Sequence, residues 1–421
     1  MTKLFQICIL LVMLSLAAGN SYGQVIYTTN GTCDPNLVGY FNTQSCWIKT
    51  GNNCSAALVP PVTGTVLCPV TVVINHPINL TTFNFGANVT VIVNSGGVWN
   101  ISGNITQTQR IVSKLVIDGG QVNVGGSVVL SSGISTAKTT LRIETRNSGI
   151  LNVTNAFTTG NNSLVEISGD QSGSLNTGTF NLGNLTNLNL NSGGIVNVSG
   201  NFNQVAQSVS NIVIDGGELN INGSVLLAAG STSVSTTLRI DTKNLGLFNI
   251  GNSLNLGNNS FVEIKGDDSG SINTGFIDLG QRSRLDILAG GRLISSGNTR
   301  YNGNNARMDV YGYFKTLALD IIGGTGLQFN SLGSANVVVE TDVTVGGTSS
   351  ISFGGDSVVE IGGDFKISGN PTVVFGPDAD VFVCGEPDVK VENQVEGCLL
   401  PVDYLYITSV YSKVSNTNLL T

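Results

Sequence analysis

Residues 115–133 read LVIDGGQVNVGGSVVLSSG, and a near copy, IVIDGGELNINGSVLLAAG, occupies residues 212–230. Each copy holds three short runs in which apolar and polar residues alternate, and turns that contain glycine separate these runs. Short alternating runs bounded by turn residues are typical of β-strands that bury one face. The stretch therefore predicts three short strands joined by tight corners.

The copy extends over a unit of 97 residues, from about 94–190 to about 191–287. NSGGVWNISGN at Asn94, for example, returns as NSGGIVNVSGN at Asn191. No insertion changes the offset, so each position of the first copy has a fixed partner in the second. Self-similarity at a constant period is the signature of a repeat architecture.

Apolar anchor residues recur within the unit about every 24 residues. They are Val91, Leu115, Leu141, Leu164, Leu188 and Ile212. One coil of this length cannot bury its apolar row alone, whereas coils stacked about 4.8 Å apart complete their backbone hydrogen bonds and share one core. No apolar stripe of helical period lies beyond residue 23.

These patterns predict an all-β fold, a right-handed parallel β-helix or solenoid of roughly 24-residue coils with a disulfide-bearing N-terminal cap. An array of β-sandwiches is the alternative. A sandwich domain needs about 100 residues and longer strands, while the similarity here recurs four times within 97 residues.

The chain divides into four predicted parts. Residues 1–23 combine a basic start with an apolar core, which predicts a secretory signal peptide. Residues 24–66 are predicted to form an irregular, cysteine-rich N-terminal cap, and residues 67–385 the solenoid, with degenerate coils after residue 300. Residues 386–421 are predicted to be a C-terminal cap and the start of an incomplete β-sandwich module. We therefore expect a protein that is secreted or held on the outer cell surface.

Six cysteines remain beyond the signal peptide, near the two ends of the predicted solenoid: Cys33, Cys46, Cys54, Cys68, Cys384 and Cys398. An even number of cysteines in an exported chain predicts disulfides. Cys384 and Cys398 form the natural C-terminal pair, while the connectivity of the first four stays open. A zinc site is not expected, because the chain has one histidine, His76, and no CxxC motif.

The C-terminal stretch LLPVDYLYITSVYSKVSNTNLLT carries a motif formed by Leu400, Pro401, Val402, Asp403 and Leu405. This segment resembles the junction in surface and secreted proteins exported by the type IX secretion system. There it opens a small β-sandwich module that precedes the C-terminal sorting domain. The resemblance implies an adhesin-like β-solenoid surface protein of this cargo type. Because the sequence ends at Thr421, inside the second strand of that module, it also implies truncation before the sorting domain.

Charged residues make up only 11% of the chain, and the formal net charge is −8. No basic stripe is present, so nucleic acid and anionic membranes are not expected as partners. No apolar run beyond residue 23 is long enough for a transmembrane helix. The predicted surface is rich in Asn, Ser, Thr and Gly, which suit a polysaccharide, another glycan or a cell surface better than a charged partner.

An asparagine follows an apolar residue in one predicted strand of successive coils: Asn100, Asn123, Asn152, Asn176, Asn197, Asn220, Asn249 and Asn273. Because the flanking apolar residues point inward, the asparagines point outward and align about 4.8 Å apart. Stacked amides can hydrogen-bond along such a row and stabilise the rod. The other interpretation is a face that binds glycans or ice, although the Thr-x-Thr rows that favour ice binding are absent.

Four acidic residues repeat as well. Asp118 and Glu144 are predicted to take similar places in adjacent coils, and Asp215 and Asp241 repeat them 97 residues later. Stacked carboxylates could bind Ca²⁺ through their oxygens. The alternative is a solvated face, because basic residues lie beside these acids in the sequence and can neutralise them. No other cofactor is expected.

Cleavage of a polysaccharide requires two carboxylates that face one bond, usually as a unique constellation on one coil. The acids here are duplicated with the repeat, as structural positions are. The best enzyme-like patch interrupts the repeat and comprises Arg300, Tyr301, Arg307, Asp309, Tyr311 and Tyr313. The sequence therefore predicts a structural or adhesive protein without assigned catalytic residues, and a polysaccharide-degrading lyase or glycoside hydrolase is the alternative.

Overall fold

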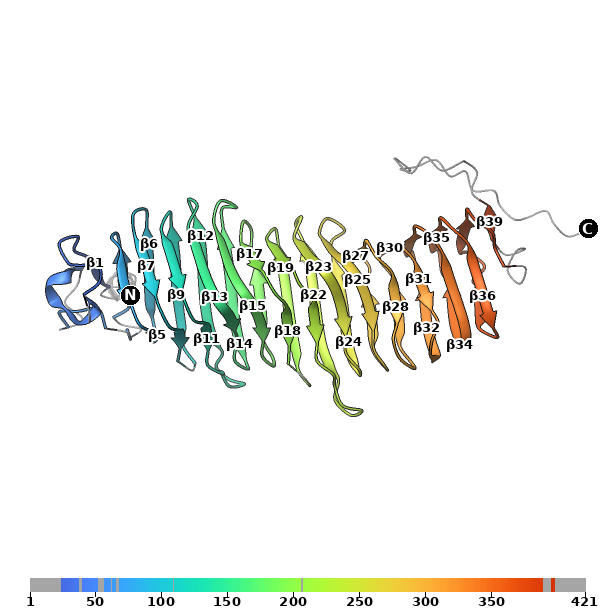
Figure 1. Cartoon of the computed structure of the whole chain (residues 1–421), viewed down its shortest axis with the longest axis horizontal. Helices are drawn as coiled ribbons and strands as arrows, with labels where there is room; N and C mark the ends of the chain where they lie inside the picture. Colours follow the sequence, from blue (N-terminus) through green and yellow to red (C-terminus); the bar gives the residue numbers. More distant parts are fainter. Residues whose placement is uncertain are drawn as a thin grey trace, which may run out of the picture.

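A computed structural model describes residues 24–388, except 38–39, 52–56, 62, 66–67, 109 and 206, together with residues 395–397. The chain forms a straight rod of stacked coils (Figure 1). Strands account for 58% of the residues and helices for 2%, in about 14 turns of about 23 residues. The predicted all-β parallel solenoid is thereby confirmed. The predicted signal peptide and most of residues 386–421 lie outside the described residues.

Each coil passes through three rows of strands, and strands at the same place in successive coils pair in parallel. Row 1 contains β1 (Val25–Thr29), β3 (Val70–Ile74), β6 (Val89–Asn94), β9 (Val112–Asp118), β12 (Thr139–Arg146), β14 (Ser163–Gly169), β16 (Asn187–Leu190), β19 (Val209–Asp215), β22 (Thr236–Lys243), β24 (Ser260–Gly266), β26 (Arg284–Ile287), β29 (Arg307–Val310), β32 (Thr325–Ser331) and β37 (Thr372–Phe375).

Row 2 follows row 1 along each coil. It contains β4 (Ile78–Leu80), β7 (Val98–Ile101), β10 (Gln121–Val124), β13 (Ile150–Thr158), β15 (Ser174–Leu182), β17 (Ile195–Val198), β20 (Glu218–Ile221), β23 (Leu247–Leu256), β25 (Ser271–Leu279), β27 (Arg292–Ser295), β30 (Tyr313–Thr316), β33 (Asn336–Val339), β35 (Val358–Ile361), β38 (Asp380–Val383) and β39 (Glu396–Gly397).

Row 3 completes the coil. It contains β5 (Phe83–Phe85), β8 (Ile105–Gln107), β11 (Val128–Leu130), β18 (Phe202–Gln204), β21 (Val225–Leu227), β28 (Thr299–Tyr301), β31 (Leu319–Ile321), β34 (Val343–Phe353) and β36 (Phe365–Gly369). The long strands β13, β15, β23 and β25 run through rows 2 and 3, and β34 runs from row 3 into row 1.

The core is a single apolar column along the axis of the rod. Alternate residues of each strand point into it, as in β6, where Val89, Val91 and Val93 are buried and the residues between them are partly exposed. Phenylalanines from successive coils stack nearly face to face. The ring centroids of Phe157 and Phe180 lie 4.9 Å apart, and those of Phe180 and Phe202 lie 5.1 Å apart.

The coils are not uniform in length, and this corrects the predicted anchors. Leu115 pairs with Ile143 rather than with Leu141, because the loop at residues 131–138 lengthens this coil. The predicted anchor Leu164 lies on the outer face, where it is partly exposed. A register error of one residue moves a side chain to the opposite face of a strand, so the anchor spacing gave the coil length but not the register.

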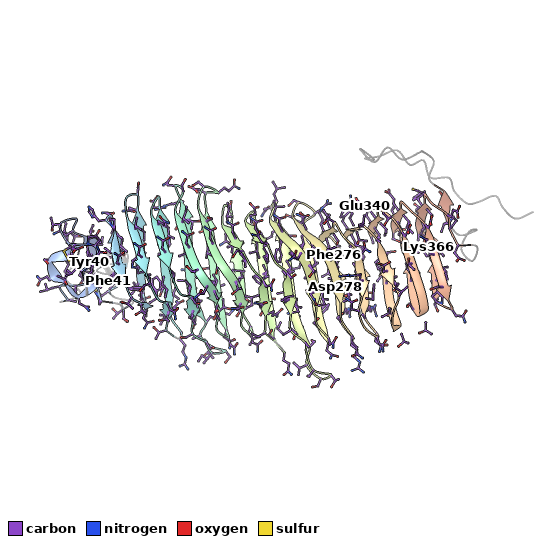
Figure 2. All side chains as sticks on the ribbon, in the orientation of Figure 1. Tyr40, Phe41, Phe276, Asp278, Glu340 and Lys366 are labelled. Carbon is purple, nitrogen blue, oxygen red and sulfur yellow. A yellow bond between two sulfur atoms is a disulfide. The ribbon has the colours of Figure 1, made fainter. Side chains whose placement is uncertain are left out.

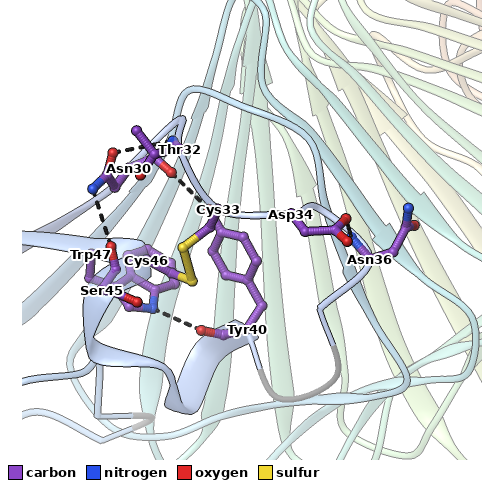
Figure 3. The surroundings of a disulfide bond; sticks show 9 residues. All are labelled: Asn30, Thr32, Cys33, Asp34, Asn36, Tyr40, Ser45, Cys46 and Trp47. Atoms are coloured by element: carbon purple, nitrogen blue, oxygen red, sulfur yellow. Dashed lines mark hydrogen bonds between the residues drawn. A yellow bond between two sulfur atoms is a disulfide. The ribbon is translucent and has the colours of Figure 1, made fainter.

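The N-terminal cap contains strands, which corrects the prediction of an irregular segment. Strand β1 pairs in parallel with β3 and antiparallel with β2 (Trp47–Gly51). Two short 3₁₀ helices, η1 (Tyr40–Asn42) and η2 (Gln44–Cys46), precede β2. The indole Nε1 of Trp47 donates to the carbonyl oxygen of Tyr40 at 3.2 Å (Figure 3). The antiparallel strand and the buried aromatic rings close the end of the core.

Disulfides hold both ends of the rod, as predicted from the cysteine count. Cys33 and Cys46 are joined, with their Cα atoms 5.3 Å apart (Figure 3). Cys68, near the N-terminal end of the rod, and Cys384, near its C-terminal end, each take part in a separate disulfide. Cys54 and Cys398 lie outside the described residues, and the predicted pairing of Cys384 with Cys398 stays a prediction.

An aspartate clamps one corner of each 97-residue unit. Asp267 accepts hydrogen bonds from the hydroxyl of Ser269 at 2.5 Å and from the backbone N–H of Asn244, in the preceding coil, at 2.9 Å. Asn244 has a left-handed φ of 52°. The hydroxyl and backbone N–H donors lower the pKa of Asp267 to about 2, and its repeat partner Asp170 has the same pKa for the same reason. The charged carboxylate therefore fixes the strained corner.

Replacing Asp267 with Asn should lower the melting temperature at pH 7. Because the folded-state pKa is lowered to about 2, the stabilisation is complete above the unfolded pKa of about 3.9 and is lost as the pH falls towards 2. Asp267→Asn should therefore flatten the decline of melting temperature between these two pH values. Asp268→Asn is the matched control at the adjacent corner residue. If the melting temperatures of the wild type and Asp267→Asn declined equally with falling pH, the hydrogen bonds of the Asp267 carboxylate would not stabilise this corner.

Removal of a stacked core ring should be costly. Phe180 is fully buried between the rings of two neighbouring coils, so Phe180→Ala should lower the free energy of unfolding by about 3–5 kcal/mol. Leu245→Ala is the control, because this side chain is 73% exposed and should change stability little. Chemical denaturation followed by circular dichroism measures both. A loss below about 1 kcal/mol for Phe180→Ala would contradict a continuous, tightly packed column.

Candidate functional site

The outer face of row 2 carries a continuous ladder of asparagine amides. All eight predicted asparagines, Asn100, Asn123, Asn152, Asn176, Asn197, Asn220, Asn249 and Asn273, occupy the same register position in successive coils. Each Nδ2 donates to the Oδ1 of the asparagine one coil closer to the N-terminus, at 2.7–3.0 Å. The predicted outward row and its structural hydrogen bonding are confirmed.

Two further asparagines extend the ladder towards the N-terminus. Asn100 donates to Asn79 at 2.8 Å, and Asn79 donates to Asn36 of the cap at 2.6 Å. The sequence analysis missed both. Asn79 lies between Ile78 and Leu80 in the same apolar-Asn-apolar pattern, so the pattern could have identified it. Asn36 carries no such signal, because the non-repetitive cap brings it to the end of the row.

The ladder leaves part of each amide available to a ligand. An amide has two N–H donors and two oxygen lone pairs, and an interior rung such as Asn197 uses one N–H and one lone pair within the ladder. The ladder residues are half-buried rather than covered. All amides point the same way, so each hydrogen bond polarises the next. The row therefore presents evenly spaced N–H donors with a fixed direction, and free acceptors at rungs such as Asn197.

A shallow groove follows the ladder. Three hollows of about 570, 360 and 520 Å³ succeed one another along it. The first two share Asn152 and Thr154, and the last two share Asn197 and Asn222, so they form one groove. Ladder amides line one side, and residues of the corner between rows 2 and 3 line the other: Thr81, Ser102, Gly125, Thr154, Gly178, Ser199, Asn222, Gly251, Gly275 and Ser296.

The groove is long and uncharged. It runs from Asn36 in the cap to Ser296, just past the last rung. Ten rungs spaced about 4.8 Å apart give a length on the order of 40 Å. Every residue that lines the three hollows is neutral. A groove with these properties can hydrogen-bond an extended polar chain without selecting for charge.

The four predicted calcium ligands lie on row 1, each in contact with a basic side chain. Asp118 lies opposite Arg146, not Glu144, in the strand register, which corrects the predicted correspondence. Arg146 Nη2 lies 3.0 Å from Asp118, and Lys114 Nζ lies 2.7 Å from Glu144.

The second pair of predicted calcium ligands is arranged in the same way. Lys243 lies 3.5 Å from Asp215, and Lys265 lies 3.4 Å from Asp241. No group of three or more His, Cys, Asp or Glu side chains suited to a metal occurs within the described part of the chain. Calcium binding stays a prediction.

The predicted enzyme-like patch is divided among the three rows. Arg300 pairs with Asp278 on row 3 at 2.9 Å, Arg307 and Asp309 lie on row 1, and Tyr313 lies on row 2. These side chains therefore do not converge on one substrate.

Asp309 and its neighbour Asp286 form the most buried charged cluster among the described residues. Asp309 is fully buried and lies 2.7 Å from Arg307 Nε and 3.2 Å from Arg284 Nη2. Asp286 lies 2.7 Å from Arg284 Nη2. Burial raises the pKa of Asp286, against the opposing effect of the Arg284 guanidinium. Two carboxylates matched by two guanidiniums stabilise this part of row 1, on a different face from the groove.

Comparison of the chain with family models, curated proteins and solved structures finds no match. Function is therefore inferred from the groove and its chemistry. Within the described residues, no helix is long and apolar enough to cross a membrane.

Deletion of one interior amide should destabilise the rod. Asn197→Ala removes the ladder donor of Asn176 and the ladder acceptor of Asn220, which should cost about 1–2 kcal/mol in the free energy of unfolding. Asn273→Ala removes only the last rung, with one ladder bond, and should cost less. Chemical denaturation compares the two variants. Equal losses would show that the amides act independently rather than as a ladder.

Proposed function

We propose that the protein is an exported adhesive rod of a cell surface and that its asparagine groove binds an extended, neutral polysaccharide. The groove carries this proposal, because it joins ten stacked amides and a wall of small residues into one continuous uncharged track. The resemblance of the C-terminal segment to type IX secretion cargo supports the surface location, and the disulfides at both ends suit an oxidising environment.

The ligand class follows from the spacing and chemistry of the rungs. Sugar hydroxyls donate and accept hydrogen bonds, as the second N–H of the ladder amides and the second lone pair of rungs such as Asn197 do. A pyranose in an extended β-linked chain advances by nearly the same distance as one coil of the rod, so successive sugars meet successive rungs. A charged polymer gains nothing from a neutral groove and leaves its ionised groups without partners.

Binding is favoured over cleavage. Hydrolysis needs two carboxylates on either side of one glycosidic bond, and the residues that line the groove include no carboxylate. The buried pair Asp286 and Asp309 lies on row 1 and is held by arginines. The polysaccharide-degrading alternative is tested in the same assay as binding.

Blocking the groove should abolish retention without loss of stability. Thr154 is exposed and lines the groove near its middle, so Thr154→Arg places a long charged side chain across the track. The mature protein is passed over immobilised extended β-1,4-glucan, with maltohexaose and a polyuronate as competitors. We expect retention of the wild type, at least tenfold weaker retention of Thr154→Arg, and unchanged melting temperatures.

Thr232→Arg is the matched control, because Thr232 is exposed in a loop away from the groove. Each assay is run with Ca²⁺ and with chelator, which tests the predicted calcium ligands, and new chain ends are scored to test cleavage. Equal retention of Thr154→Arg and the wild type would exclude the groove as the binding site. The appearance of new polysaccharide chain ends would show cleavage, and the protein would then be an enzyme rather than an adhesin.

A further inference from the structure

A partly exposed aromatic ring lies on the same strand as Asn273, the last rung of the ladder. Phe276 belongs to β25 and directly follows Gly275, which lines the groove. It is 44% exposed, although most phenylalanines of the described chain lie in the core. Phe276 and Asp278 lie on the same coil of the rod (Figure 2).

Neighbouring residues hold this ring in place. A Cβ atom added to Gly297, in the next coil, would meet two ring carbons of Phe276 at 2.6 Å, so the ring lies directly over that glycine. The Arg300 guanidinium carbon lies 5.3 Å from the ring centroid, within range of a cation–π contact. Arg300 Nη2 lies 2.9 Å from Asp278 Oδ1, and Asn302 Nδ2 donates to the same oxygen at 3.0 Å. The ring and the polar groups therefore form one supported cluster.

The positions 97 residues earlier in the chain serve as an internal reference. They hold Thr179, Asn181, Asn203 and Val205 where the later positions hold Phe276, Asp278, Arg300 and Asn302. Asn203 Nδ2 donates to Asn181 Oδ1 at 2.9 Å, so uncharged amides suffice to hold the same corner. The aromatic ring and the ion pair are thus absent from the equivalent positions 97 residues earlier and present where the ladder ends.

The ladder ends at this coil with an amide oxygen that accepts no further ladder hydrogen bond. Asn273 donates to Asn249 at 2.7 Å, but its register partner in the next coil is Ile294, which offers no donor to its Oδ1. The last acceptor of an aligned row of amides therefore has no ladder donor, at the end of the groove and on the coil that carries Phe276.

We infer that Phe276, Arg300 and Asn302 form a terminal subsite in which one pyranose of the bound polysaccharide stacks on the aromatic ring. This inference rests on the proposed function and adds to it the position of one end of the bound sugar chain. The C–H groups of a pyranose pack on an aromatic face, while the remaining N–H groups of Arg300 donate to the sugar hydroxyls. The amide ladder binds the length of the chain, and the ring binds the sugar at its end.

The test compares Phe276→Thr, the residue of the first copy, with the wild type, using cellohexaose in isothermal titration calorimetry. We expect about tenfold weaker binding with an unchanged melting temperature. Phe276→Tyr keeps the ring and should bind within twofold of the wild type. Tyr311→Thr, at an aromatic residue that is 39% exposed and does not line the groove, is the matched control and should also bind within twofold.

The outcomes separate the two proposals. If the wild type binds neither cellohexaose nor the immobilised glucan, the proposed function fails. If the wild type binds and Phe276→Thr binds equally well, the groove stands and the subsite is overturned. If Phe276→Thr lowers the melting temperature and Phe276→Tyr fails to restore binding, the ring acts on packing alone, and the subsite is likewise overturned.

Discussion

The structure depends on the in-register parallel pairing of each coil with the next. This pairing places equivalent residues of successive coils on top of one another at a spacing of about 4.8 Å. A residue type that repeats in the sequence therefore becomes a stack in space. The phenylalanine column, the asparagine ladder and the ion pairs of row 1 are three products of this one constraint.

The same constraint gives the rod two different surfaces. Charges gather on row 1, where acids and bases from adjacent coils neutralise one another, as Arg142 and Glu166 do at 2.6 Å. Row 2 carries the neutral ladder and the groove beside it. A row of ion pairs that neutralise one another and an uncharged groove with free hydrogen-bonding groups suit a rod that binds an uncharged polymer along its length.

The repeat made most of the fold predictable. A constant offset of 97 residues and three short alternating runs per coil specify parallel stacking, and the outward asparagines follow from strand alternation. The strand register was harder to predict from the sequence, because it depends on loop lengths. The loop at residues 131–138 makes Ile143, not the predicted Leu141, the partner of Leu115.

The site was predicted only in part. The groove wall consists of Ser, Thr and Gly at corners, where the sequence shows turns but not that they line a hollow. Two kinds of contact could not be predicted from the sequence. Asn36, from the non-repetitive cap, hydrogen-bonds to the ladder. Arg300 pairs with Asp278 of the neighbouring coil. Such contacts depend on how the coils stack, and local pattern carries no information about them.

The most direct test of the central claim is a crystal structure of residues 24–421 with cellohexaose. The account predicts an extended sugar chain along row 2, with hydroxyls hydrogen-bonded to ladder amides such as Asn176 and Asn197. Sugar bound instead on row 1 beside Asp286 and Asp309, or an empty groove at saturating cellohexaose, would contradict it.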